Sequence, residues 1–267
     1  MTSGAYCGYT IIYEKHKIGY QYDGTRYHGW QIQPGCAAIQ QVLQERISKI
    51  TGEPVSVVAA GRTDAGVHAL AQVASFQTAT AFQCGTIRDA LNALLPWDIR
   101  ITEACDTDAA FHPRHDAKGK VYFYIIANMR VLSPFLYNYA WRIPQCLDFD
   151  SMRSASILFQ GTHDFTSFRA SGCGAKNPAK TIFQCSMEKA DVMDFMTAGV
   201  RGDFLKLRVE GDGFLRHMVR NIAGTIVEVG KGRLKSEAIL ELLEARDRRL
   251  AGPTAPARGL FLERINY

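Results

Sequence analysis

The fold of this chain is decided between residues 55 and 76, which read VSVVAAGRTDAGVHALAQVASF. Apolar residues dominate 55–60 and 67–76, and a polar loop, 61–66, joins the two runs. Short runs of this kind, bounded by glycine, are typical of buried strands. We therefore expect two strands with a loop between them, and a loop held by rigid strands is where functional side chains collect.

Inside this loop a cation (Arg62), a hydroxyl (Thr63) and a carboxylate (Asp64) stand side by side between two glycines. Glycine permits backbone angles and close approaches that other residues cannot adopt. A hairpin turn in which Asp64 caps a backbone amide explains the same residues without any function. Spacing alone leaves these two interpretations equal. The loop is not a P-loop, because Val67 follows the second glycine where a P-loop has lysine.

Outward from the loop, strand and helix patterns alternate along the chain. Alternating apolar residues predict strands at 18–22, 99–103, 118–127, 204–209 and 259–265. Helical spacing predicts helices at 37–50, 86–95, 150–159 (capped by Asp150), 214–229 and 236–246. Joints of unequal length favour an α+β, or mixed α/β, fold. A strand, an Asp-Gly turn and a helix occur near residue 23 and again near residue 212, so we expect two similar halves, 1–130 with the Asp64 loop and 131–267.

Composition limits the class of protein. With 267 residues, 47% hydrophobic and 21% charged, the chain is neither disordered, collagen-like nor a coiled coil. No apolar run reaches the roughly 18–20 residues of a membrane span, and the first residues lack the layout of a secretory signal, so we expect a cytoplasmic protein. Seven scattered cysteines without a C-x-x-C pair, and histidines without ligand spacing, predict neither disulfides nor a metal. A net charge of +5 suits an anionic partner but does not identify one.

Three further patterns carry possible chemistry. Tyr122 and Tyr124 share one face of a predicted strand, where they either stack on nucleobases or, more commonly, fill the core. Arg216 and Arg220 share a face of a largely apolar helix, which calls for a carboxylate partner such as Asp64. Residues 166–187 hold cations and no acid, which predicts either a flexible basic loop that contacts phosphates or a solvated loop without a role; the cations are Arg169, Lys176 and Lys180.

Five stretches, in order along the chain, resemble the tRNA pseudouridine synthase A family. They are 22–31 (YDGTRYHGWQ), 61–76 (GRTDAGVHALAQVASF), 111–114 (FHPR) followed by 120–124 (KVYFY), 163–173 (HDFTSFRASGC) and 213–221 (GFLRHMVRN). The second and the last are highly specific. The chain departs from the family's common residues at Pro113, at 118–120 and at 174–175, which bears on RNA preference and not on the chemistry.

The resemblance implies a specific enzyme. Such proteins isomerise uridine to pseudouridine at positions 38, 39 and 40 in the anticodon arm of tRNA, without metal or cofactor. They are homodimers with the pseudouridine synthase fold, in which two pseudo-symmetric halves share a mainly antiparallel mixed sheet flanked by helices. It also implies roles for residues of this chain: Asp64 is catalytic and paired with Arg220, Tyr122 packs on the extruded uracil, Arg62 fills the vacated space, and Arg169, Lys176 and Lys180 hold phosphates.

Two alternatives stay open at this stage. A related synthase that acts on other uridines, in tRNA or another RNA, would share the same motifs, because site choice lies in surface loops. A non-catalytic RNA-binding protein of the same fold is the second, although intact Asp64, Tyr122 and Arg220 argue against it. The residues also leave open whether Asp64 attacks C1′ of the ribose, attacks C6 of the base or removes a sugar proton.

Overall fold

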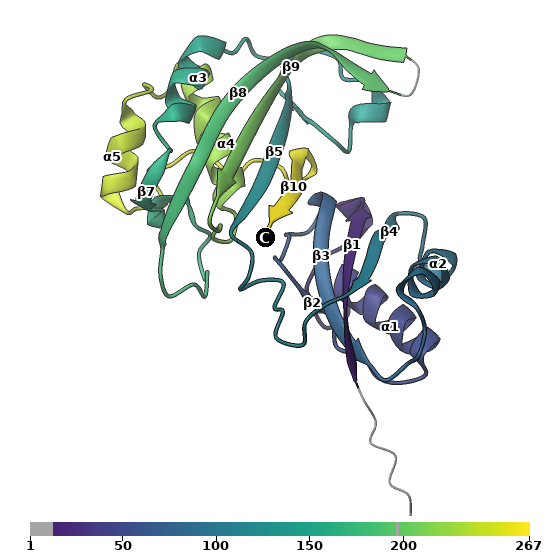
Figure 1. The fold of residues 1–267 in the computed structure, drawn as a ribbon. Helices are drawn as coiled ribbons and strands as arrows, with labels where there is room; N and C mark the ends of the chain where they lie inside the picture. The colour runs from purple at the N-terminus through teal and green to yellow at the C-terminus, as the bar shows by residue number, and fades with distance from the viewer. Residues whose placement is uncertain (1–12, 196–197) are drawn as a thin grey trace, which may run out of the picture.

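The computed structural model describes residues 13–195 and 198–267. Its strands form a single sheet in the order β4-β1-β3-β10-β5-β9-β8-β7, with β2 beside β3 and β6 beside β5 (Figure 1). The strands are β1 (Glu14–Tyr22), β2 (Val58–Ala59), β3 (His68–Thr78), β4 (Ile99–Asp106), β5 (Gly119–Ala127), β6 (Trp141–Arg142), β7 (Gly161–Asp164), β8 (Ala179–Phe195), β9 (Ala198–Gly211) and β10 (Leu260–Asn266). The helices are α1 (Ile39–Thr51), α2 (Cys84–Leu94), α3 (Phe149–Ile157), α4 (Met218–Gly230) and α5 (Ala238–Ala245).

The pairing of the strands confirms the predicted fold class. Most neighbours run antiparallel, while β10 pairs with β3 and β6 pairs with β5 in parallel. The last strand, β10, therefore lies between β3 and β5 in the middle of the sheet. Because β10 bonds to both neighbours, it joins the first strands of the chain to the later ones. The division at residues 130 and 131 stays a prediction.

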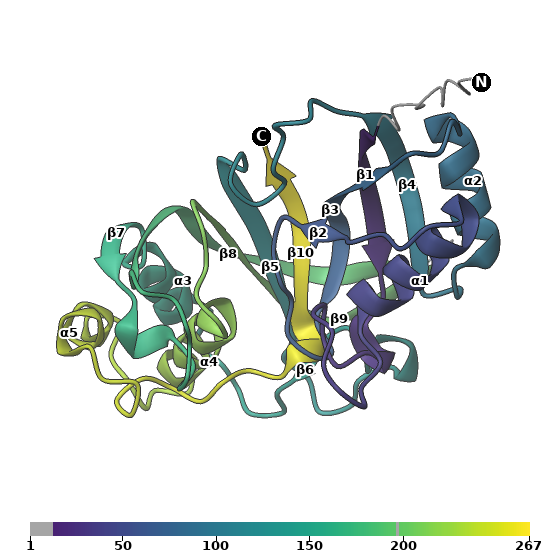
Figure 2. The ribbon, with the colours of Figure 1, turned by 90° about the horizontal axis from the view of Figure 1, so that it is seen from below.

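The helices gather in two groups. Helices α1 and α2 lie beside β1 and β4, and α3, α4 and α5 lie together near β7 and β8 (Figure 2). The amphipathic face of α1 buries Ile39, Leu43 and Ile47, at the spacing of one helix face. Helix α4 is buried along nearly its whole length, which matches the apolar sequence of 218–230. Because α4 is buried, the side chains on its first turn are held in fixed positions.

Strand β5 separates two apolar clusters. Tyr122 and Tyr124 face the main core, whereas Phe123 and Ile125 face a smaller cluster on the other side of the sheet. This is the predicted alternation, and it follows from the two-residue period of a strand. Residues 132–140 contribute Leu136 and other apolar side chains to the smaller cluster.

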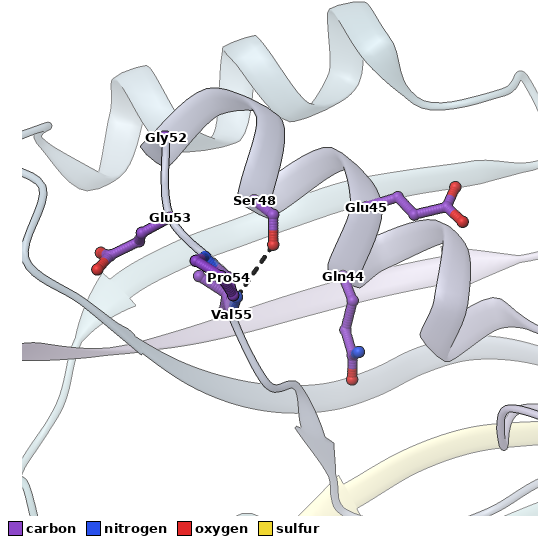
Figure 3. A pocket seen from close by; sticks show the side chains of 7 residues that line it. All are labelled: Gln44, Glu45, Ser48, Gly52, Glu53, Pro54 and Val55. Carbon is purple, nitrogen blue, oxygen red and sulfur yellow. Dashed lines mark hydrogen bonds between the residues drawn. The ribbon is translucent and has the colours of Figure 1, made fainter.

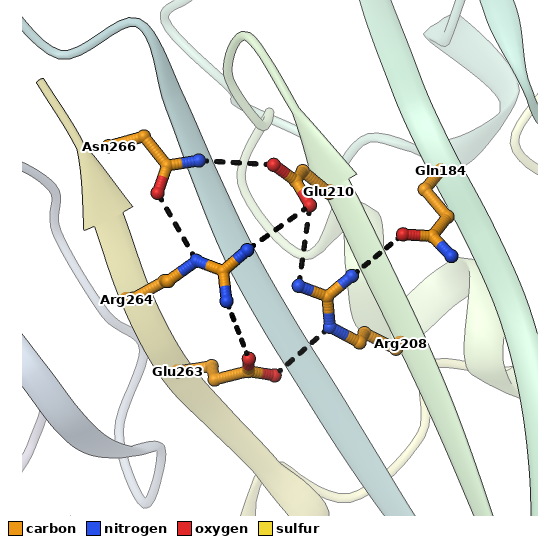
Figure 4. A network of polar contacts seen from close by, with 6 residues as sticks. All are labelled: Gln184, Arg208, Glu210, Glu263, Arg264 and Asn266. Atoms are coloured by element: carbon orange, nitrogen blue, oxygen red, sulfur yellow. Dashed lines mark hydrogen bonds and ion pairs between the residues drawn. The ribbon is translucent and has the colours of Figure 1, made fainter.

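A network of ion pairs and hydrogen bonds ties β8, β9 and β10 together (Figure 4). Arg208 contacts both Glu210 and Glu263 at 3.3 Å. Asn266 donates to Glu210 at 3.0 Å, and Arg264 lies within 3.7 Å of the same carboxylate. Arg208 and Glu210 alternate along β9 with the buried Val209, so the network lies on the face that Tyr122 does not share.

Several predicted boundaries are wrong. Helix α3 is capped by Asp148, whose side chain accepts from the backbone N–H of Ser151, and not by Asp150. Helix α4 begins at Met218, so Arg216 precedes it instead of sharing a helix face with Arg220. The expected strand at 55–60 shrinks to β2, because the backbone N–H groups of Val55 and Val57 donate to side chains of α1 instead of to a neighbouring strand. Helix α5 begins at Ala238, without a side-chain cap.

The expected basic loop at 166–187 is also wrong in part. A short 3-10 turn occupies Thr166–Phe168, and β8 begins at Ala179, so Lys180 lies on a strand. The described cysteines are all free thiols, and Cys7 lies outside the described residues. None of the helices formed by residues 13–195 and 198–267 is long and apolar enough to cross a membrane.

Candidate active site

The loop between β2 and β3 is held in place by hydrogen bonds within the loop and to neighbouring residues. The backbone N–H of Trp30 donates to the carbonyl of Thr63 at 3.0 Å. The Thr63 hydroxyl is 2.7 Å from the phenol of Tyr22, and the N–H of Val67 donates to the carbonyl of Asp64 at 3.2 Å. The backbone is therefore a turn, as the simpler interpretation predicts. The Asp64 side chain, however, points to α4 and bonds to it.

Two glycines allow this close packing. A Cβ on Gly29, which has a φ of 95°, would lie 2.7 Å from the carbonyl oxygen of Thr63. A Cβ on Gly24 would lie 2.0 Å from the carbonyl oxygen of Val67. Both distances are shorter than any side chain tolerates, so only glycine lets the 24–29 segment press against the loop. This contact fixes the position from which Asp64 projects.

Arg220 on α4 supplies the partner for Asp64. Its Nη1 lies 3.2 Å from Oδ2 of the carboxylate, and its Nε donates to the carbonyl of Ala255 at 2.8 Å. The guanidinium is thus held at two points, and its side chain is 15% exposed against 24% for Asp64. The predicted pairing of these two residues is confirmed. Because both groups are largely removed from water, each offsets the cost of burying the other.

His217 is a third member of the site, which the sequence analysis did not single out. Its Nε2 lies 3.5 Å from Oδ2 of Asp64. Its backbone has a φ of 64°, which is uncommon outside glycine and marks local strain. Burial lowers the pKa of His217 and the nearby arginines lower it further, although Asp64 opposes them. The imidazole is therefore uncharged at neutral pH and acts as a polar neighbour of the carboxylate.

Tyr122 lies on β5 beside this pair. Its side chain is 7% exposed and meets the ring of Phe214 edge to face, with centroids 5.2 Å apart. Burial, together with the nearby Tyr22 and Asp64, raises its pKa well above the usual tyrosine range, so the phenol keeps its proton. Tyr124 is fully buried and donates to the carbonyl of Pro256 at 2.7 Å, so it belongs to the core.

The residues predicted to contact RNA come from two parts of the chain, the Asp64 loop and the segment between residues 166 and 180. Arg62 is exposed on the Asp64 loop. Arg169 ends the 3-10 turn that adjoins the start of α4, where the N–H of Ala170 donates to the carbonyl of Arg216 at 2.9 Å. Lys176 is exposed in the turn before β8. Lys180, on β8, donates to the carbonyl of Ala179 at 3.0 Å, so the predicted flexible loop does not extend to it.

A separate surface hollow of about 480 Å³ lies where α1 ends (Figure 3). Ser48 in α1 accepts a hydrogen bond from the N–H of Val55 across it at 3.0 Å. Gln44 and Glu45 line one side of it. It includes neither Asp64 nor Arg220, so the site described above is defined by its side chains and not by this cavity.

Lys120 supports the start of the Asp64 loop. Its ammonium donates to the carbonyl of Ala60 at 2.7 Å and lies 3.3 Å from where a Cβ on Gly61 would be. Burial, and secondly the charge of Arg114, lower the pKa of Lys120 from 10.5 to about 8. Burial of the Lys120 ammonium therefore lowers the stability of the folded protein, although its hydrogen bond to Ala60 holds the start of the loop.

This cost predicts a pH effect. The unfolded chain keeps the ordinary lysine pKa, so between pH 8 and 10.5 it binds more protons than the folded protein, and the free energy of unfolding rises with pH through that window. We expect the unfolding free energy of wild type, minus that of Lys120→Met, to rise by about 2 kcal/mol from pH 7 to pH 10. Urea denaturation measures it, with the exposed Lys118→Met as control. A constant difference would contradict the burial of the charge.

Comparison with known proteins places this chain in a family. The family model described as tRNA pseudouridine synthase matches residues 18–116 and 155–267. A protein named tRNA pseudouridine synthase A from Thermoanaerobacter sp. (strain X514) is 42% identical over 247 residues, which cover 92% of this chain and 97% of that protein. The protein of the same name from Acetivibrio thermocellus is 43% identical over 251 residues, which cover 94% of this chain and 98% of that protein.

Among solved structures, one described as a Cbf5-Nop10-Gar1 complex matches with a TM-score of 0.31 and 15% identity, over 79% of this chain and 45% of that one. The match to the family model includes the Asp64 loop and the first turn of α4, the two segments that the ion pair joins. With that match over most of its length and relatives above 40% identity, the chain belongs to the tRNA pseudouridine synthase family.

Proposed function

We propose that this protein isomerises uridine to pseudouridine at positions 38, 39 and 40 of the tRNA anticodon stem-loop, with Asp64 as its catalytic residue. The observation that carries the proposal is the largely buried pair of Asp64 and Arg220, whose atoms lie 3.2 Å apart. A carboxylate is not buried beside a guanidinium at the end of a tightly held loop without cost. Strained and charged groups collected in this way are typical of active sites.

The isomerisation of uridine can be carried out with a single carboxylate. The bond between N1 of uracil and C1′ of ribose breaks, the base turns, and C5 bonds to C1′. The proton on C5 is lost and N1 gains one, so the product is an isomer and nothing is consumed. Asp64 acts as nucleophile or base in its ionised form, with Arg220 as its counter-charge. His217, uncharged beside it, is a polar group within reach of the ribose or base.

The target base must leave the stack before it reaches Asp64, at a cost of a few kcal/mol. We assign Tyr122 to the face of the extruded uracil, because its ring is buried beside the carboxylate. Arg62 is exposed on the same loop, two residues before Asp64, and is therefore placed to occupy the space that the base vacates.

Phosphate binding falls to the segment that leads into β8. Arg169 adjoins the first turn of α4, Lys176 is exposed, and Lys180 lies at the start of the strand. These cations would hold the backbone of an RNA stem and read its shape instead of its base edges. Reading shape allows one enzyme to reach several neighbouring uridines.

A homodimer, two functional halves divided at residues 130 and 131, and a cytoplasmic location complete the proposal. The sheet face around Phe123 and Phe261 supports a dimer, because both rings remain half-buried beside a small apolar cluster. Such a face suits burial against a second copy. Light scattering of the purified protein measures the mass, and a monomer at working concentration would contradict this part.

One prediction of this proposal concerns the reaction. Unmodified tRNA transcripts with uridine at positions 38, 39 and 40 are incubated with protein, and pseudouridine is mapped by carbodiimide labelling and primer extension. We expect modification by wild type and a decrease in activity of at least about a thousandfold in Asp64→Asn, which keeps the shape but not the charge. tRNA binding should persist.

The exposed Asp150→Asn on α3 is the matched control and should behave as wild type. Modification at other uridines would keep the chemistry and refute the positions. Binding without any modification by wild type would favour a non-catalytic RNA-binding protein. Full activity of Asp64→Asn would refute the assignment of the catalytic residue.

The second prediction concerns the phosphates of the tRNA. Replacing Arg169, Lys176 and Lys180 by glutamine should weaken tRNA binding and reduce the slope of log K against log salt by about 0.7–0.9 for each phosphate that is no longer neutralised. The control removes the same charge from exposed positions on α1, α2 and α3, namely Lys49, Arg88 and Arg153. If the salt dependence of tRNA binding has the same slope in the two triple variants, the segment that carries Arg169, Lys176 and Lys180 is not part of the binding surface.

A further inference from the structure

Three side chains that commonly bind metals meet where β1, α2 and β4 come together. His16 lies on β1, Cys84 is the first residue of α2, and Asp106 is the last residue of β4. Their ligand atoms all lie within 4.8 Å of one another. The register of β1 and β4 pairs His16 directly with Asp106, which puts both side chains on one face of the sheet.

The distances suit a single small ion. Nδ1 of His16 is 2.9 Å from Oδ1 of Asp106, Sγ of Cys84 is 3.0 Å from the same oxygen, and Sγ is 3.6 Å from Nδ1. Ligands at 2.0–2.3 Å from a tetrahedral zinc ion lie about 3.3–3.6 Å from one another. The three atoms therefore form one face of such a tetrahedron after shifts of about 0.5 Å or less.

The fold holds one ligand firmly and leaves another accessible. His16 is 1% exposed, and its ring packs against Phe76 with centroids 5.3 Å apart. Its Nε2 is buried without a hydrogen-bond partner among the described residues, so Nδ1 is the nitrogen that faces the cluster. The Asp106 side chain is 74% exposed. An ion can thus enter from solvent and keep a water molecule as its fourth ligand.

The charges around Cys84 favour a cation. The Asp106 carboxylate oxygen lies 3.0 Å from Sγ of Cys84. Without an ion the thiol is protonated and donates to Asp106. One thiolate and one carboxylate together balance the charge of a divalent ion.

We propose that His16, Cys84 and Asp106 bind one Zn²⁺ ion through imidazole, thiolate and carboxylate, with water in the fourth position. The mixture of sulfur, nitrogen and oxygen suits zinc, whereas Ca²⁺ and Mg²⁺ prefer oxygen alone. Binding releases the thiol proton to solvent, and Nδ1 of His16 binds the ion as a neutral imidazole that carries its proton on Nε2. The spacing of 16, 84 and 106 carries no motif, which is why the sequence analysis predicted no metal.

The ion would have a structural role, at a point in the fold distant from the reaction. It would join β1, the start of α2 and the end of β4. Tyr22, which contacts the Asp64 loop, lies six residues beyond His16 on β1, or about 20 Å along the strand. We therefore expect zinc to raise thermal stability and to leave pseudouridine formation unchanged.

The test uses the full chain, freed of metal with a chelator and titrated with Zn²⁺ or with Co²⁺ as a coloured substitute. We expect one ion per chain, a thiolate-to-cobalt charge-transfer band and a melting temperature that rises with Zn²⁺. Cys84→Ser should lose the band. Asp106→Asn, at an exposed position where the fold does not depend on the side chain, should weaken Zn²⁺ binding at least about tenfold.

Cys105→Ser is the matched control, because this half-buried cysteine is the neighbour of Asp106 on β4 but is not part of the cluster. It should keep the band and the thermal shift. The proposal is overturned if wild type takes up no stoichiometric Zn²⁺, if Cys84→Ser keeps the cobalt band, or if the band disappears in Cys105→Ser. Circular dichroism shows that each variant is folded.

Discussion

The structure depends on one ion pair, between the carboxylate of Asp64 and the guanidinium of Arg220. Its partners are 156 residues apart in the sequence. Neither charge is well solvated, so the fold must bring both to one point or bear the cost of a buried charge alone. The two elements that meet there, the loop after β2 and the helix α4, come from opposite ends of the chain.

The central position of β10 makes that meeting possible. The chain returns after α5 through Ala255, whose carbonyl accepts from Arg220, and then enters β10 between β3 and β5. Tyr122 on β5 is thereby carried to the same site as the loop that precedes β3. Because β10 pairs with both neighbours, the strand that follows the Asp64 loop and the strand that carries Tyr122 belong to one continuous sheet. Such a fixed arrangement suits a reaction in which one bond between base and ribose breaks and another forms.

Sequence patterns predict much of the local structure, and the family resemblance predicts the pair at the centre of the site. The β5 alternation and the α1 face follow from residue type and spacing. The role expected for Asp64 follows from the family resemblance, because spacing alone fits a simple hairpin turn equally well. The same patterns do not predict β8, because a register shift between Ile182 and Gln184 breaks its two-residue period. His217 could not be found, because its contact with Asp64 depends on a left-handed backbone that only the packed helix imposes. The cluster of His16, Cys84 and Asp106 likewise exists only in three dimensions.

The most direct test of the account is a double-mutant cycle on Asp64 and Arg220. The free energy of unfolding is measured by urea denaturation for wild type, Asp64→Ala, Arg220→Ala and the double variant. If the pair holds the site together, Arg220→Ala destabilises the wild type by about 1–3 kcal/mol more than it destabilises Asp64→Ala. Additive effects of the two substitutions would contradict the central role of the ion pair.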